Sequence, residues 1–471
     1  MLKKAAQVVT GNALGFILSL VRNLLVARLV SPENYGIASS FALAMSLIEM
    51  MSYLGFNQLM VVDKDGDEPH FQAAMQGFQI LRGCFSSVML FIVARPYASF
   101  LHIEHAAWAF EVLAIVPFIN GFQHCDPFRA RRHLNFTPMV LSTTIPALIA
   151  VIVVWPMALA WGDYRIMLGS IIVQQLATVL ITHMTAERPY RATLDRALMR
   201  HATAFGWPIL LNGILLFGVF NGERLIVGRE LGMVQFAYFS MAFTLTLTPT
   251  LVLASSGQSL FLPQLTRALD NPREFQRLSD LSVECFLVIG LLLILGSSLV
   301  GGPLVHLLAG KTYLPILSFL VPMAVMQAIR VAKTGSAVVA LSIGKTGNAI
   351  IGNLPRVASL PISYWIALNG GTVLEIIWVA LAAEVVGFAA ALWVAIKGTN
   401  LTLGRLVQPM ALSALTCVLA TLDALRTPPL PGPIENLHPG LLLVTAAGLA
   451  ALLSMTELRA YTLARWRAWR R

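Results

Sequence analysis

Residues 23–40 read NLLVARLVSPENYGIASS, and residues 224–241 read RLIVGRELGMVQFAYFSM. Each stretch has the pattern of an apolar helix that ends, a short turn, and a second apolar helix that begins. At an offset of about 201 positions the second stretch resembles the first, with Arg28 aligned to Arg229. The two stretches therefore predict that one helical element occurs twice in the chain.

The composition predicts a membrane protein. Of the 471 residues, 57% are hydrophobic and 12% are charged, and the mean hydropathy is +0.74. A soluble protein of this length needs a largely polar surface and could not hide so much apolar area. Apolar runs of roughly 20 residues recur along the chain, each long enough to cross the hydrocarbon layer. We expect an all-α polytopic membrane protein with about 14 transmembrane helices.

A basic segment, residues 185–204, divides the chain into two similar parts. We expect an N-terminal lobe of about six helices over residues 1–184 and a second such lobe over residues 205–397. Residues 398–471 would form two additional helices and a basic tail. Because each lobe holds an even number of spans, we predict a parallel repeat whose axis runs along the membrane normal.

The distribution of arginine among the short loops sets the predicted orientation. Arginines concentrate in the loops that face the cytoplasm if the N-terminus is cytoplasmic, for example Arg129, Arg131, Arg132, Arg188 and Arg267. Both termini are then cytoplasmic. The net charge of +10 follows from this bias and from attraction to anionic lipid, without a nucleic acid partner. The acidic segment 63–68 is an exception on the predicted inner side.

Polar and ionisable residues inside apolar segments mark the candidate site. In the first predicted span they recur at steps of three and four and so share one helical face: Asn12, Gly15, Ser19, Arg22 and Asn23. A charge at mid-bilayer costs on the order of 2.5–3.5 kcal/mol, so this face should look into a bundle or a wet cavity. The candidate substrate-binding residues are Arg22, Asn23, Glu49, Arg82, Glu223, Arg224, Glu284 and Arg356.

Two interpretations of these residues stay open. Each residue could belong to a structural ion pair between helices, such as Glu49 or Glu223 with a nearby arginine. As a set, arginines in both halves favour a cationic chamber for an anionic substrate, because a guanidinium can bond two phosphate oxygens at once. The sequence contains no catalytic triad, metal-ligand spacing or disulfide framework, so we expect neither an enzyme nor a bound metal or other cofactor.

Three short segments resemble a known family. Residues 22–29, RNLLVARL, and residues 31–36, SPENYG, resemble the opening of polysaccharide flippases in the multidrug/oligosaccharidyl-lipid/polysaccharide exporter superfamily. Residues 261–267, FLPQLTR, are similar to the segment after the eighth span of that family. The predicted number of spans, the halfway repeat and the chain length agree with this resemblance.

The resemblance implies a flippase for undecaprenyl-pyrophosphate-linked oligosaccharide in a bacterial inner membrane. Two lobes would rock about a cationic cavity and carry the substrate from the cytoplasmic to the outer leaflet. Arg22 matches an arginine that points into the cavity of related peptidoglycan-precursor flippases. The next position is acidic in those proteins but is Asn23 here, which argues against a peptidoglycan precursor and leaves coupling to Na⁺ or H⁺ open.

The implied partners are the lipid-linked oligosaccharide, membrane lipids, and the polymerase and glycosyltransferases of the same pathway. That pathway could serve exopolysaccharide, capsule or O-antigen in lipopolysaccharide, and the residues do not choose among them. The sugar composition of the substrate stays open as well.

Three other functions compete with this interpretation. A cation-coupled drug or metabolite antiporter of the same superfamily would need acidic residues dominating its cavity, whereas arginines outnumber acids in the early spans of the first half. A membrane-embedded glycosyltransferase would need a catalytic carboxylate or histidine on a sizeable outer loop, and every predicted outer loop is short. A scaffold for glycan-assembly enzymes would depend on the basic inner loops rather than on buried arginines.

Overall fold

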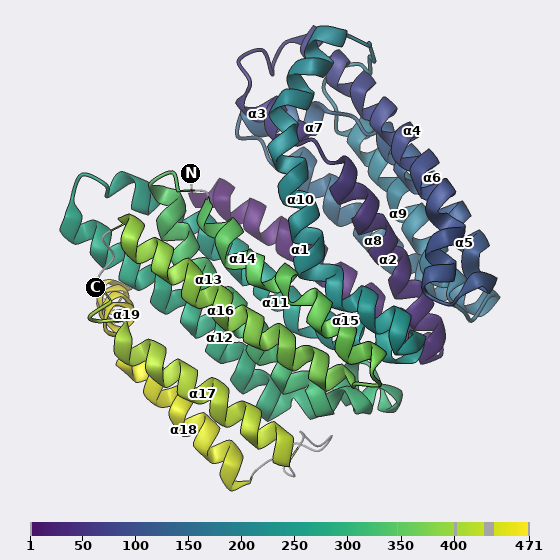
Figure 1. The fold of residues 1–471 in the computed structure, drawn as a ribbon. Helices are drawn as coiled ribbons and strands as arrows, with labels where there is room; N and C mark the ends of the chain where they lie inside the picture. The colour runs from purple at the N-terminus through teal and green to yellow at the C-terminus, as the bar shows by residue number, and fades with distance from the viewer. Residues whose placement is uncertain (1, 346, 400–402, 428–437, 470–471) are drawn as a thin grey trace. The chain divides into compact units, whose positions relative to one another are not determined.

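The computed structural model describes residues 2–345, 347–399, 403–427 and 438–469, excluding the side chains of 2–10, 12, 349, 398, 399, 464, 465 and 467–469. Every regular element in these ranges is helical (Figure 1). By packing, the chain divides into unit 1, Met1–Ala237, and unit 2, Tyr238–Arg471. The predicted all-α class is confirmed for the described part of the chain.

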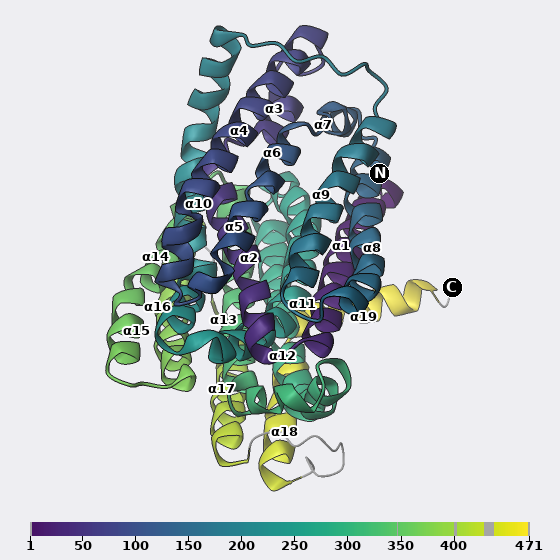
Figure 2. The same ribbon diagram turned by 90° about the vertical axis from the view of Figure 1, so that its right-hand side faces the viewer.

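Unit 1 is built from long helices interleaved with short ones. Its elements are α1 (Leu2–Leu29), α2 (Pro32–Ser52), α3 (Phe56–Val62), α4 (Pro69–Phe100), η1 (Glu104–Ala106), α5 (Ala107–Leu113), α6 (Ile115–Gly121), α7 (Asp126–Arg132), α8 (Thr137–Ala160), α9 (Arg165–Met184) and α10 (Arg196–Glu230). Helix α8 packs on both α1 and α9, and α4 packs on α5 and α6 (Figure 2). Helix α10 packs against α2, so the division by packing falls later in the chain than the predicted linker 185–204.

Unit 2 begins within α11 (Gly232–Arg267) and is centred on α13. Its further elements are α12 (Pro272–Leu308), η2 (Lys311–Ile316), α13 (Leu317–Ser342), α14 (Gly347–Ala358), α15 (Leu360–Leu368), α16 (Val373–Thr399), α17 (Val407–Arg426), α18 (Pro439–Ser454) and α19 (Thr456–Trp469). Helix α13 packs against α12, α16 and α17, and α17 lies beside α18 (Figure 1). Helix α19 leaves α18 at an angle of 70°.

The helices have the length and hydropathy of membrane spans. Among the described residues, 10 helices are long and apolar enough to cross a membrane, or up to 12 if each of two bent pairs is one span. The remaining predicted spans correspond to α1 and to α14 with α15, which are helical but do not pass this test. The chain is a multi-pass membrane protein.

Both quoted stretches form the predicted helix, turn and helix. In the first, α1 ends at Leu29, and the Ser31 side chain caps α2 by accepting a hydrogen bond from the backbone N–H of Asn34 at 3.3 Å. Pro32 follows at the first helical position, where its missing N–H is harmless. In the second, α10 ends at Glu230 and Gly232 turns the chain with φ +82°, a conformation that favours glycine. Two different turns therefore produce the same local arrangement.

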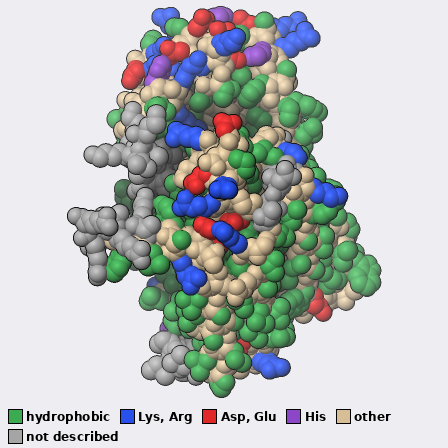
Figure 3. Space-filling model, turned by 90° about the vertical axis from the view of Figure 1, so that its left-hand side faces the viewer, with side chains coloured by type: hydrophobic (Ala, Val, Ile, Leu, Met, Phe, Trp, Pro, Cys, Tyr) green, Lys and Arg blue, Asp and Glu red, His purple; other side chains and the backbone are tan. Residues whose placement is uncertain are grey.

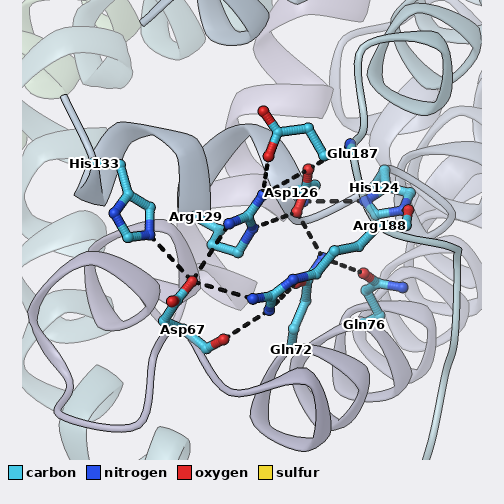
Figure 4. A network of polar contacts seen from close by, with 9 residues as sticks. All are labelled: Asp67, Gln72, Gln76, His124, Asp126, Arg129, His133, Glu187 and Arg188. Carbon is cyan, nitrogen blue, oxygen red and sulfur yellow. Dashed lines mark hydrogen bonds and ion pairs between the residues drawn. The ribbon is translucent and has the colours of Figure 1, made fainter. Parts of the chain in front are cut away.

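A network of polar contacts explains the acidic loop between α3 and α4 (Figure 4). Oδ1 of Asp67 accepts hydrogen bonds from Arg129 at 3.4 Å and from Arg188 at 3.3 Å. The same oxygen lies 3.2 Å from Nε2 of His133. The hydrogen bond to His133, together with the two arginines, holds the pKa of Asp67 below its usual value. Asp67 thus pairs with Arg129 and Arg188, two of the arginines from which the sequence predicted the membrane orientation.

Arg129 extends this network to the segment after α9. Its Nε donates to Oδ1 of Asp126 at 2.6 Å, and its Nη2 donates to Glu187 at 2.5 Å. The backbone N–H of Glu187 donates to Oδ2 of Asp126 at 2.8 Å. The network therefore holds the α3–α4 loop, α7 and the start of the predicted linker together. In Figure 3, charged side chains gather at the upper end of the drawn face, the end of unit 1 where Figure 1 places α3 and α7.

Candidate functional site

Two of the predicted arginines lie within electrostatic range of one buried tyrosine in unit 1. Tyr35 of α2 is 1% exposed and interacts electrostatically with Arg22 of α1 and with Arg224 of α10. Both arginines are half-buried. Packing of α10 against α2 thus places two cations that lie far apart in the sequence within electrostatic range of the same side chain.

The Arg22 guanidinium has only part of its hydrogen-bonding capacity filled within the described chain. Its Nη1 donates to the side-chain oxygen of Gln174 in α9. Its Nε is buried and has no hydrogen-bond partner among the described residues. Asn23, next in α1, is half-buried. The Asn12 side chain, at the start of the predicted polar face, lies outside the described residues.

Arg224 is held by neutral and aromatic neighbours. Its Nη1 donates to Oδ1 of Asn221 at 3.1 Å, and its guanidinium lies 5.6 Å from the ring centroid of Phe236. Asn221 in turn donates to Oγ of Ser46 in α2 at 3.4 Å. Glu223, the adjacent candidate in α10, is 3% exposed.

Glu49 and Arg82 line a separate polar cavity of about 220 Å³ in unit 1. Glu49 lies near the end of α2, and Arg82 lies in α4. The two side chains interact electrostatically, as expected for an acid and an arginine on neighbouring helices. Arg22 and Arg224 are not among the residues that line this cavity.

Arg356 belongs to a buried ionic cluster in unit 2. Glu384 of α16 is 0% exposed. One of its oxygens accepts a hydrogen bond from Nε of Arg330 at 2.7 Å, and the other accepts one from Nζ of Lys333 at 3.0 Å. Nε of Arg356, also 0% exposed, lies 3.4 Å from Glu384. Three cations therefore converge on this carboxylate in the described part of unit 2.

Further hydrogen bonds attach the cluster to a neighbouring helix. Lys333 also donates to the backbone carbonyl of Gly352 at 2.9 Å and to Oδ1 of Asn353 at 2.9 Å, both in α14. The cluster thereby connects α13, α14 and α16. Lys333 was not among the candidates from the sequence. Its position three residues after Arg330, within an apolar helix, was the available signal.

Glu284 of α12 caps a helix of unit 2. Its carboxylate accepts hydrogen bonds from the backbone N–H groups of Leu458 at 2.7 Å and Glu457 at 3.5 Å. These groups belong to the first turn of α19, where an N–H has no partner within the helix. A carboxylate is also favoured there by the helix dipole. The structure thus shows Glu284 as the cap of α19.

Unit 2 also contains a large apolar cavity. Its volume is about 710 Å³, and it is lined by α12, α13, α16 and α17. Representative lining residues are Leu287, Leu291, Trp378, Phe388, Met410 and Cys417. The sequence did not predict it, because apolar side chains that line a cavity look the same as those that face lipid.

The comparisons with known proteins identify a family and a fold. The profile of a family described as "Polysaccharide biosynthesis protein" matches residues 25–318. A search of curated proteins found no match.

Solved structures of membrane transporters share the fold. The lipid II flippase MurJ, in an inward closed conformation, is 13% identical, with 97% of this chain and 99% of that chain covered and a TM-score of 0.70. An inward-facing multidrug resistance MATE family transporter of the MOP superfamily is 13% identical, with coverage of 82% and 95% and a TM-score of 0.68. A MOP superfamily transporter from Pyrococcus furiosus is 15% identical, with coverage of 84% and 96% and a TM-score of 0.58.

Proposed function

Because the chain belongs to the polysaccharide biosynthesis protein family, we propose that it is a flippase for a lipid-linked oligosaccharide. The substrate is an undecaprenyl-pyrophosphate-linked unit, carried from the cytoplasmic to the outer leaflet of a bacterial inner membrane. The product supplies a polymerase of surface polysaccharide synthesis. Both termini lie in the cytoplasm. The observation that carries the proposal is that Arg22 and Arg224 both lie within electrostatic range of the buried Tyr35.

The arginine pair suits a pyrophosphate. Two guanidinium groups in membrane-spanning helices are costly unless an anion compensates them. A pyrophosphate loses its hydration when it enters the protein, and guanidinium donors can replace that hydration with charge-assisted hydrogen bonds. A neutral amide contacts each arginine: Gln174 accepts a hydrogen bond from Arg22, and Asn221 accepts one from Arg224. An amide carries no charge of its own, so these contacts orient the guanidinium groups without cancelling their charge.

The apolar cavity in unit 2 supports a lipid-linked substrate. At about 710 Å³ it falls within the range of roughly 300–1,000 Å³ that is usual for ligand sites. Apart from the hydroxyl groups of Ser413 and Thr421, its side-chain lining is hydrocarbon, aromatic and sulfur, which suits a prenyl chain and offers little to a sugar or a phosphate. Transport then requires the substrate to contact the two units in alternation, with binding weak enough for release.

The lipid head group is assigned to fewer arginines than the sequence suggested. Arg356 approaches Glu384, and Arg82 lines a cavity with Glu49. We therefore assign the pyrophosphate to Arg22 and Arg224 alone, with Asn23 beside them in α1.

A leaflet assay tests the proposal. In a strain depleted of the protein and complemented with wild type, the lipid-linked oligosaccharide should reach the outer leaflet, and with Arg22→Ala plus Arg224→Ala it should accumulate on the cytoplasmic leaflet. Arg273→Ala, at an exposed position in α12, is the matched control and should behave as wild type. Immunoblots of membranes would verify equal amounts of each variant.

The result also separates the competing functions. A leaflet distribution that does not change on depletion would overturn the flippase proposal. Efflux of cationic dyes from cells overexpressing the protein would then favour the antiporter. Normal export with the double arginine variant would instead remove the arginine pair from the mechanism.

A further inference from the structure

The polar cavity in unit 1 has an unusual lining for a membrane-spanning bundle. Its volume is about 220 Å³. The walls come from the ends of α2, α3 and α6 and from the third and fourth turns of α4. The lining residues are Glu49, Tyr53, Phe56, Asn57, Gln79, Arg82, Asn120 and Gln123. Four carboxamides, an acid, an arginine and two aromatic rings therefore face one space.

Most of the polar side chains in this lining have their hydrogen-bonding groups free. Gln79 is engaged, since it donates to the backbone carbonyl of Asn120 at 3.1 Å and accepts from Sγ of Cys125 at 3.3 Å. The side chains of five others form no hydrogen bond with any described residue: Glu49, Asn57, Arg82, Asn120 and Gln123. Nε of Arg82 is buried without a partner in the described chain. A buried polar atom in this state needs water or a ligand, and the other four side chains are half-buried or exposed, so their polar groups are accessible.

The two charged groups of the lining do not form an ion pair with each other in the described structure. Glu49 and Arg82 interact electrostatically, but among the described residues they form no ion pair within 4.0 Å. The Arg82 guanidinium lies 5.8 Å from the ring centroid of Phe56. A ligand can therefore accept a hydrogen bond from Arg82 and donate one to Glu49 at the same time.

We propose that this cavity binds one neutral, hydroxyl-rich pyranose ring of the glycan, and the proposal rests on the flippase function above. A sugar hydroxyl both donates and accepts, so it matches a lining in which carboxamides do the same, Glu49 accepts and Arg82 donates. The ring of Tyr53 offers apolar surface for the C–H face of a pyranose.

Size and charge exclude the other ligand classes. A cavity of about 220 Å³ is smaller than the roughly 300–1,000 Å³ of sites for drug-sized ligands, so it admits a single ring. Glu49 and Arg82 cancel in formal charge, so the lining lacks the excess of cations that a phosphate needs. A lone carboxylate among amides is a poor site for a divalent metal, which requires several oxygen ligands in fixed geometry.

Binding of defined lipids to the full-length protein in nanodiscs tests this site. The probes are undecaprenyl pyrophosphate and its conjugates with glucose, galactose and N-acetylglucosamine, with affinities compared by native mass spectrometry. We expect wild type to bind at least one conjugate about tenfold more tightly than the sugar-free lipid, the effect of one or two net hydrogen bonds. In the variant Asn120→Ala plus Gln123→Ala, the ratio of the affinity for that conjugate to the affinity for the sugar-free lipid should fall to about one.

The controls keep the outcomes distinct. Gln264→Ala changes an exposed carboxamide of α11 that bonds only its own helix, and it should retain the wild-type ratio. Gln123→Ala alone, expected to reduce the ratio, replaces the double variant if the latter does not accumulate. If wild type binds the sugar-free lipid but gains nothing from any of the three sugars, the neutral-sugar site is refuted and the flippase proposal stands. If wild type binds none of the lipids, the flippase proposal itself is refuted, and this site with it.

Discussion

Gly36 of α2 lies directly against the backbone carbonyl oxygen of Met233 at the start of α11, so closely that a Cβ on Gly36 would collide with it. Each residue belongs to one of the two repeated stretches, residues 23–40 and 224–241. The two copies of the element therefore touch through their backbones within unit 1.

Replacing Gly36 with alanine should destabilise the protein. A carbonyl oxygen of a packed helix cannot move aside cheaply, so we expect Gly36→Ala to lower the free energy of unfolding by about 1–3 kcal/mol. Thermal unfolding in detergent measures the effect. Gly15→Ala is the matched control, because a Cβ there meets nothing within 4 Å. Alanine favours helix by about 1 kcal/mol over glycine, so this control should be neutral or stabilising. Equal melting temperatures for the two variants would refute the close contact.

Removing the charge of Glu384 should cost more stability than a surface substitution. Glu384→Gln would leave Arg330, Lys333 and Arg356 buried together without their counter-charge. Breaking a buried ion pair in this way costs about 3–5 kcal/mol. Glu33→Gln, the same change at an exposed position in α2, should leave the melting temperature near that of wild type. A Glu384→Gln protein that melts with the Glu33→Gln control would show that the cluster is not needed for folding.

The contacts of Asp67 predict a dependence of stability on pH. Its pKa is lowered in the folded protein, first by the hydrogen bond to His133. The stabilisation that ionised Asp67 gives the folded protein is therefore fully present above the ordinary aspartate pKa of about 3.9. It is lost as the pH falls through the lower pKa that Asp67 has in the folded protein. The melting temperatures of wild type and Asp67→Asn should differ at neutral pH and converge below about pH 4. Asp65→Asn, in the same loop and exposed, should show a smaller gap throughout. A gap that widens on acidification would contradict this sign.

Loss of the Glu284 carboxylate should loosen α19. Glu284→Ala would leave two N–H groups of its first turn unsatisfied, and loss of such a cap costs about 0.5–2 kcal/mol. Hydrogen exchange over residues 456–463 should become several-fold faster, because the helix opens more often. Glu284→Gln keeps one acceptor oxygen and should have the smaller effect. Unchanged exchange in Glu284→Ala would mean that α19 is held in place by other contacts.

Lysine at positions 22 and 224 should preserve part of the transport. An ammonium keeps the positive charge but lacks the planar fork that bonds two oxygens. We expect Arg22→Lys plus Arg224→Lys to flip the substrate about ten- to a hundredfold more slowly than wild type, as for the loss of one charge-assisted hydrogen bond, yet faster than the double alanine variant. A double lysine variant no better than double alanine would indicate that fork geometry, not charge, carries the function.

The sequence by itself determined the membrane fold and its repeated element. Hydropathy and helix ends are local properties, because each apolar run satisfies its own backbone hydrogen bonds and each turn is specified by a few neighbouring residues. For the same reason the sequence could single out Arg22 and Arg224 as candidates, since a charge inside an apolar run stands out without knowledge of its neighbours.

Only the tertiary structure decided what those residues touch. Glu284 has the same sequence signature as a cavity acid, but packing places it at the start of α19. The acidic segment 63–68 forms ion pairs with arginines of α7 and of the segment after α9, which are distant in the sequence. The lining of the polar cavity rests on neutral amides such as Asn120 and Gln123, which leave no charge signal in the sequence. Contacts between distant segments depend on how whole helices pack, and no local pattern encodes them.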